Sequence, residues 1–141
     1  MTNEILPRDG LAFFLYRSMA VPGLGESDLA EIVAVARARN QATGLTGCLH
    51  YEDGLFFQWL EGPAPDLWRV VDSIRRDPRH RELTVLEQGP LAGRRFQSWR
   101  MRFSDRDHAS LMDWFAGKGV STVDPSVYAG NVASFLVRAA G

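Results

Sequence analysis

Three uncharged polar residues occupy places where the sequence otherwise predicts a hydrophobic core. Tyr16 lies near the end of the apolar stretch LAFFLYRS, Asn40 ends the apolar stripe of a predicted helix, and Gln58 lies in the middle of LFFQWLE. A buried amide without a partner costs roughly 1–3 kcal/mol, so either Gln58 points to water or a group inside the protein hydrogen-bonds it. A phenol and two amides supply exchangeable donors and acceptors, but no base, nucleophile or metal ligand. Such a set suits a planar, apolar ligand with carbonyl and N–H groups along one edge, as in a flavin ring.

The segments that carry Tyr16 and Asn40 read as a strand followed by a helix. Residues 11–18 are rich in strand-forming apolar residues. The next segment predicts a helix with Ser27 as its N-cap and Gly44 just after its last residue. One stripe of this helix contains Leu29, Val33, Ala36 and Asn40, at spacings of four, three and four residues.

A hairpin and a second helix follow. The pair Asp53-Gly54 between LTGCLHY and LFFQWLE is a strong signal for a tight turn between two strands. The segment PAPDLWRVVDSIRRDP predicts an amphipathic helix, with Pro65 in its first turn and Pro78 at its end. Its apolar face consists of Leu67, Val70, Val71 and Ile74.

Two more strand patterns, ELTVLEQGP and SWRMRF, complete the order β-α-β-β-α-β-β. Two right-handed βαβ units joined by a hairpin predict an α+β fold, a ferredoxin-like β-α-β-β-α-β sheet with a fifth strand and both helices on one face. Alternation within LFFQWL places Phe56, Gln58 and Leu60 on one face, and Leu55, Phe57 and Trp59 on the other. Both sets are largely apolar, so both faces should be covered.

The C-terminal segment is expected to cover the second face. We divide the chain into a flavin-binding unit, residues 1–104, and a helical extension, residues 105–141, packed on the sheet and too small to be a separate domain. The extension has apolar residues at helical spacing: Leu111, Met112, Trp114, Phe115, Val127, Tyr128, Val132, Phe135 and Leu136. A self-association surface could share this role, so a homodimer is one expected assembly.

The composition fits one globular domain. The 141 residues are 45% hydrophobic and 23% charged, with a net charge of −1, which favours neither nucleic acid nor an anionic membrane. The one cysteine, Cys48, excludes an internal disulfide and is expected to be an inert buried thiol. His50 and His108 are expected to be solvated. No signal peptide or membrane span is predicted, so we expect a cytoplasmic protein.

The segments LYRS, ARARNQATGLTGCLHYEDGLFFQWLEG, IRRDPRH and RRFQSWRMRF, in this order and spacing, strongly resemble the BLUF family of blue-light sensors that use FAD. The resemblance covers about residues 10–104 and is to the short members without an effector domain. It implies FAD bound non-covalently between the two helices of a ferredoxin-like fold. The contacts it implies lie on the ring, so FMN and riboflavin remain alternatives.

The resemblance also implies roles for individual residues. Tyr16 and Gln58 match the photoactive pair, in which the glutamine bridges the tyrosine to the flavin N5/O4 edge. Asn40 matches the asparagine at the O4/N3 edge. Trp99 and Met101 match a mobile Trp-x-Met pair on the fifth strand, one of which lies near Gln58 depending on state.

Softer assignments follow from the same resemblance. Arg76 and Asp77 match residues of the second helix near the ring's O2 edge, whereas Arg75 and His80 could instead meet the phosphates. Ile32 is a further expected cofactor contact. Ala36 stands where many members carry a serine or another polar residue, so a second hydrogen bond to Gln58 is not expected.

In the family, blue light drives electron and proton transfer from the tyrosine through the glutamine to the flavin. The radical pair then recombines and leaves a rearranged hydrogen-bond network with a red-shifted flavin spectrum. No net turnover results, so we expect a sensor and not an enzyme. Because no output domain follows residue 141 in this sequence, the signal is expected to leave through a surface, to an unidentified partner protein.

Two other classes of protein compete with this interpretation. RNA-recognition modules also place aromatic residues on central strands of a ferredoxin-like sheet, but Glu52-Asp53-Gly54 stands where their basic-Gly-aromatic motif would begin. A flavoprotein that is not photoactive is the second alternative. No general base or nucleophile joins Tyr16, Asn40 and Gln58, which makes flavin turnover chemistry hard to place.

Overall fold

The computed structural model describes residues 9–96, 101–105, 109–118 and 125–140. The elements follow one another as β1 (Leu11–Ala20), α1 (Glu26–Thr43), β2 (Thr46–Glu52), β3 (Leu55–Pro63), α2 (Ala64–Arg76), β4 (His80–Pro90), β5 (Arg102–Asp105), α3 (Leu111–Lys118) and α4 (Pro125–Ala140). The predicted order of strands and helices is therefore confirmed.

The sheet has the strand order β4-β1-β3-β2-β5. β1 pairs antiparallel with β3 and β4, and β2 pairs antiparallel with β3, which confirms the ferredoxin-like arrangement. The fifth strand lies parallel to β2 at the edge of the sheet. It begins at Arg102, and residues 98–100 of the predicted strand SWRMRF lie outside the described residues.

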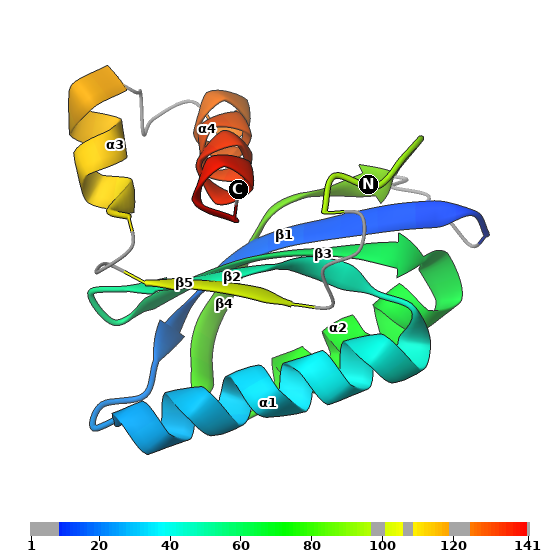
Figure 1. The fold of residues 1–141 in the computed structure, drawn as a ribbon, viewed down its shortest axis with the longest axis horizontal. Coiled ribbons are helices and arrows are strands. Elements are labelled where there is room, and N and C mark those ends of the chain that lie inside the picture. The colour runs from blue at the N-terminus through cyan, green and yellow to red at the C-terminus, as the bar shows by residue number, and fades with distance from the viewer. Residues whose placement is uncertain (1–8, 97–100, 106–108, 119–124, 141) are drawn as a thin grey trace.

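Helices lie on both sides of this sheet (Figure 1). α1 and α2 cover one face, and α4 lies over the other with α3 beside it. The face toward α1 and α2 packs a core that includes Phe14, Tyr16, Phe56, Leu60 and Leu67, and the face toward α4 packs Leu15, Phe57, Trp59, Val132 and Phe135. The alternation predicted for β3 is thus confirmed. No helix in the described part of the chain is long and apolar enough to cross a membrane.

Local chemistry explains the turns. Asp53 and Gly54 form the two-residue hairpin loop with φ of 52° and 79°, the left-handed pair that a type I′ turn requires. Gly44 ends α1 with φ of 74°, as predicted. The predicted N-cap Ser27 is wrong, since α1 begins at Glu26 with Gly25 as its N-cap. The carboxylate of Asp28 accepts the Gly25 N–H at 3.0 Å and so stabilises the earlier start.

Candidate functional site

Tyr16 and Gln58 meet because neighbouring strands place them opposite each other. Tyr16 of β1 is the register partner of Gln58 of β3, and both side chains face α1 and α2. The Tyr16 hydroxyl donates to Oε1 of Gln58, and both residues are buried. Nε2 of Gln58 donates to the sulfur of Met101 at 3.7 Å. A thioether can only accept, so these two partners together fix which end of the amide faces which neighbour.

A small cavity adjoins this pair between the two helices. It measures about 30 Å³, and its lining includes Tyr16, Ile32, Arg39, Gln58, Asp77 and His80. Small-molecule pockets usually measure roughly 300–1,000 Å³. A planar ligand can therefore enter only if side chains between α1 and α2 move aside.

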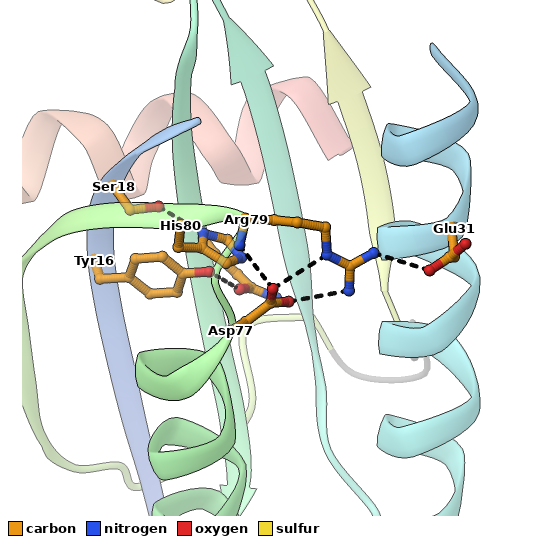
Figure 2. Close-up of polar contacts among 7 residues, drawn as sticks. Tyr16, Ser18, Glu31, Asp77, Arg79 and His80 are labelled. Carbon is orange, nitrogen blue, oxygen red and sulfur yellow. Dashed lines mark hydrogen bonds and ion pairs between the residues drawn. The ribbon is translucent and has the colours of Figure 1, made fainter. Parts of the chain in front are cut away.

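Figure 2 shows the polar contacts of the segment after α2, which supplies Asp77, Arg79 and His80 to the cavity lining. Nε and Nη2 of Arg79 bind the two carboxylate oxygens of Asp77 at 3.1 and 3.0 Å, while Nη1 binds Glu31 of α1 at 3.1 Å. Arg79 thus ties the end of α2 to α1. Nδ1 of His80 lies 2.8 Å from the hydroxyl of Ser18, and its ring approaches Tyr16 edge-on at 6.0 Å between centroids.

Burial controls the protonation of this site. It raises the pKa of Tyr16 well above the ordinary value of a phenol, against the opposing charge of Arg39, so the hydroxyl keeps its proton at all physiological pH values. Burial lowers the pKa of His80, against the attraction of Asp77, which favours the neutral ring. Burial alone would raise the pKa of Asp77, but its bonds with Arg79 hold this pKa below the usual value.

The structure brings most of the predicted site residues together. Tyr16, Ile32, Gln58, Asp77 and His80 all line the cavity. Met101 lies against Gln58, whereas Trp99 lies outside the described residues. The assignment of the five lining residues to cofactor contacts stays a prediction.

Three residues predicted to contact the cofactor are not among the described residues that line the cavity. Asn40 is fully buried at the end of α1, where its backbone carbonyl accepts the N–H groups of Gly44 and Leu45, but it is not among the described residues that line the cavity. Arg76 is exposed and is not among the described residues that line the cavity. Arg75 lies over the ring of Phe14, 5.6 Å from its centroid, and so packs on the core.

The sequence alone did not predict two arginines of the site. Arg39 and Arg79 both line the cavity, although arginine usually signals an exposed surface. The signal for Arg79 was its place between Asp77 and His80, because a carboxylate two residues away can hold a guanidinium inward. Arg39 lies one position before Asn40, on the edge of the buried stripe of α1.

The expectation that His50 is solvated is wrong. His50 is fully buried on the face toward α4, not solvated, because Glu52 and Ser104 supply partners for both ring nitrogens. His108 lies outside the described residues. The aromatic side chains that suggested RNA stacking, Phe57 and Trp59, are buried on that same face and present no surface to a base.

The donor set suits a flavin ring. Nε of Arg39 is buried and has no hydrogen-bond partner in the described structure. Because Arg39 lines the cavity, this N–H can donate to an acceptor atom of a ligand. Gln58 adds an amide that can present either an N–H or a carbonyl. Apolar walls from Ile32, Leu49 and Ile74 suit an aromatic ring. Fold and site together are typical of a small-molecule-binding domain, here with a buried Tyr–Gln pair in the lining of the cavity.

Comparison with known proteins agrees with this class. The family model for sensors of blue light using FAD, BLUF, matches residues 11–102. The photoactivated adenylate cyclase subunit beta of Euglena gracilis is 42% identical over 79 residues, which are 56% of this chain and only 9% of that protein. The dark-state structure of the BLUF protein BlrB is 30% identical, with a TM-score of 0.75 and coverage of 92% of this chain and 100% of that chain. BlsA in its ground state is 25% identical, with a TM-score of 0.80 over 91% of this chain and 88% of that one.

The chain therefore belongs to the BLUF family. It is a flavin-binding blue-light sensory domain, and its likeness to BlrB extends along the whole of that short protein, as the sequence predicted.

Proposed function

We propose that Tyr16 and Gln58 are the photoactive pair of this sensor and that Gln58 is the switch. The observation that carries the proposal is the buried hydrogen bond from the Tyr16 hydroxyl to Oε1 of Gln58 beside the cavity. The same amide donates its other end to Met101, so one side chain touches the electron donor, the cavity and the segment that leads into β5.

A bound flavin would supply the absorption of blue light and an acceptor for one electron and one proton. Tyr16 gives up the electron, and its hydroxyl proton passes to Oε1 of Gln58 as a proton leaves Nε2 toward the cavity. Return of the electron and proton restores the phenol. Gln58 can then settle with its amide rotated or in its other tautomer, which exchanges donor and acceptor ends without any backbone movement.

Rearrangement of Gln58 would change what Met101 contacts. A rotated amide presents a carbonyl to the Met101 sulfur, which has no hydrogen to donate, so the 3.7 Å contact loses its attraction. Met101 directly precedes β5, the edge strand of the sheet. We propose that β5 and the extension of residues 105–141 carry the signal to a partner protein, with no turnover of substrate.

The test is absorption spectroscopy of the protein purified with FAD, in darkness and immediately after blue light. The flavin bands should shift to longer wavelength and return in darkness. Bands that only bleach would indicate ordinary flavin reduction and contradict the proposal. Parallel loading with FMN and riboflavin will show which flavins support the shift.

A further inference from the structure

A second polar cluster lies on the face of the sheet away from the cavity. It consists of His50 and Glu52 of β2 and Ser104 of β5, all at most 2% exposed. The rings of Phe57 and Phe135 lie against His50, with centroids 6.5 and 4.8 Å away, so α4 seals the cluster from water. The photochemistry described above uses none of these groups.

The hydrogen bonds in this cluster have a defined direction. Nε2 of His50 lies 2.9 Å from Oε1 of Glu52, and Nδ1 lies 3.0 Å from the hydroxyl of Ser104. Burial lowers the pKa of His50, although Glu52 opposes this, so we take the ring as neutral. A carboxylate only accepts, so Nε2 carries the proton and Nδ1 accepts from Ser104. The chain of donors therefore runs from Ser104 through His50 to Glu52.

Glu52 continues this chain into α3. Burial alone would raise the pKa of Glu52, but its hydrogen bonds outweigh burial and hold this pKa below the usual value. Besides His50, the donors are the Ser110 hydroxyl at 2.8 Å, Leu111 N at 2.7 Å and Met112 N at 3.3 Å. These backbone groups open α3, where a negative charge is favourable because the first N–H groups lack partners within the helix.

We propose that Ser104, His50 and Glu52 are positioning residues that couple β5 to the first turn of α3. The inference rests on the proposed function, since the input is a change at Gln58 that displaces Met101. Ser104 lies three residues beyond Met101, so movement of this segment alters its bond to His50. The neutral ring of His50 carries a single N–H proton. A change in the hydrogen bond at Nδ1 therefore changes the bond from Nε2 to Glu52, and through Glu52 the contacts with α3.

The first test uses Ser104→Ala in the full FAD-loaded chain, because it cuts the chain of bonds at β5 and leaves the contacts of Glu52 with α3 intact. Hydrogen exchange of the α3 amides is measured in darkness and under blue light. Wild type should show a light–dark difference at Leu111 and Met112. Ser104→Ala should keep the flavin shift and dark exchange of wild type but lose this difference.

The matched control is Thr46→Val. Thr46 is also a buried hydroxyl on this sheet, and it donates to Glu61 at 2.8 Å, outside the cluster. This variant should keep the light–dark difference in α3. If Ser104→Ala keeps it as well, or if wild type shows none despite a flavin shift, the coupling inference is overturned and the sensor function stands. Absence of a flavin shift in wild type would instead overturn the proposed function.

A second variant, Glu52→Gln, separates coupling from simple support of the helix. The amide oxygen should keep the place of Oε1 and accept from His50 Nε2 and Leu111 N. The N–H₂ then faces the Ser110 hydroxyl, which can rotate to accept, and the Met112 N–H, which loses its acceptor. We expect dark exchange at Met112 to rise roughly five- to tenfold, as for a lost helix cap. Nitrogen chemical shifts of the ring should report the proton of His50 on Nε2 in wild type and in the variant, and a proton on Nδ1 in wild type would contradict the direction of the bonds.

Discussion

The two faces of the sheet bury polar groups in opposite ways. On the face toward α1 and α2, Gln58 is held by a phenol, which can either donate or accept, and by a thioether at 3.7 Å. On the face toward α4, Glu61 accepts four hydrogen bonds of 2.8–2.9 Å and is fully buried. A neutral amide with few partners can exchange them, whereas a carboxylate with four donors is fixed. Gln58 can thus rearrange, whereas Glu61 holds its part of the other face in place.

Two buried carboxylates, Glu61 and Glu52, bind backbone N–H groups before and after β5. Glu61 accepts the N–H groups of Arg95 and Phe96, which precede this strand. Glu52 accepts those of Leu111 and Met112, which follow it. Movement that begins at Gln58 and reaches Met101 therefore has Glu61 as a fixed support on one side and Glu52 as its link to α3 on the other.

Removal of the Tyr16 hydroxyl should have the largest effect. Tyr16→Phe keeps the ring and its packing but deletes the proton donor to Gln58, so the light-induced red shift should be abolished while flavin remains bound. Absorption spectra before and after blue light measure this. Tyr51→Phe is the control, because Tyr51 packs on the same core through Phe56 and should leave the shift intact. A shift of wild-type size in Tyr16→Phe would contradict the role of the hydroxyl.

Glu61→Gln should damage the fixed face and spare the photochemistry. The new amide donors would oppose N–H groups that the carboxylate now accepts, which costs about 1–3 kcal/mol in the free energy of unfolding. Urea denaturation measures the loss, and Glu87→Gln on the exposed side of β4 serves as the control. The flavin red shift should persist in both variants. Unchanged stability of Glu61→Gln would show that its four donors find other partners.

A buried histidine on each face of the sheet should make stability depend on pH. Burial lowers the pKa values of His50 and His80 in the folded protein. The unfolded chain then takes up protons first as the pH falls, so stability is full above about pH 6.5 and is lost below it. Replacement of either histidine by asparagine should flatten this loss by up to about 1.4 kcal/mol per pH unit. Urea denaturation at several pH values measures the slope.

Burial is the main cause at both histidines, and carboxylates oppose it at both. Glu52 and Asp105 favour the charged form of His50, and Asp77 favours that of His80, whose charge Arg79 and Arg39 oppose. If stability did not change with pH below about 6.5 in wild type, the lowered pKa values would be contradicted.

The smallest effect concerns Cys48, which tests how well α4 seals the fixed face. Burial raises the pKa of this thiol to about 12. The native protein should therefore react with iodoacetamide roughly a thousandfold more slowly than an unfolded control near neutral pH, since only the thiolate reacts. Mass spectrometry of labelled protein measures the rate. Rapid native labelling would mean that the α4 face opens readily.

The sequence was sufficient for the sheet because its strands and turns carry strong local signals. The alternation in β3, the Asp53-Gly54 turn and Gly44 each specify a backbone conformation through neighbouring residues. The convergence of Tyr16 and Gln58 followed from the same strand parity. The N-cap of α1 was misplaced because Asp28 and Ser27 are both good capping residues, and only the folded turn shows which one binds Gly25.

The polar cluster on the other face could not be found from the sequence. His50 and Glu52 alternate with apolar residues as solvated residues do, and burial becomes tolerable only when Ser104 and the first turn of α3 supply partners. Those partners lie more than fifty residues away along the chain. Local patterns report which residues are polar, but not which polar residues will find each other.

The central claim is that Gln58 is the switch, and the light-minus-dark absorption spectrum of Gln58→Leu tests it most directly. Gln41→Leu, which alters an exposed glutamine of α1, should be recorded beside it. We predict that both variants bind flavin, that Gln41→Leu shows the reversible red shift, and that Gln58→Leu shows none. A reversible red shift in Gln58→Leu would contradict the claim.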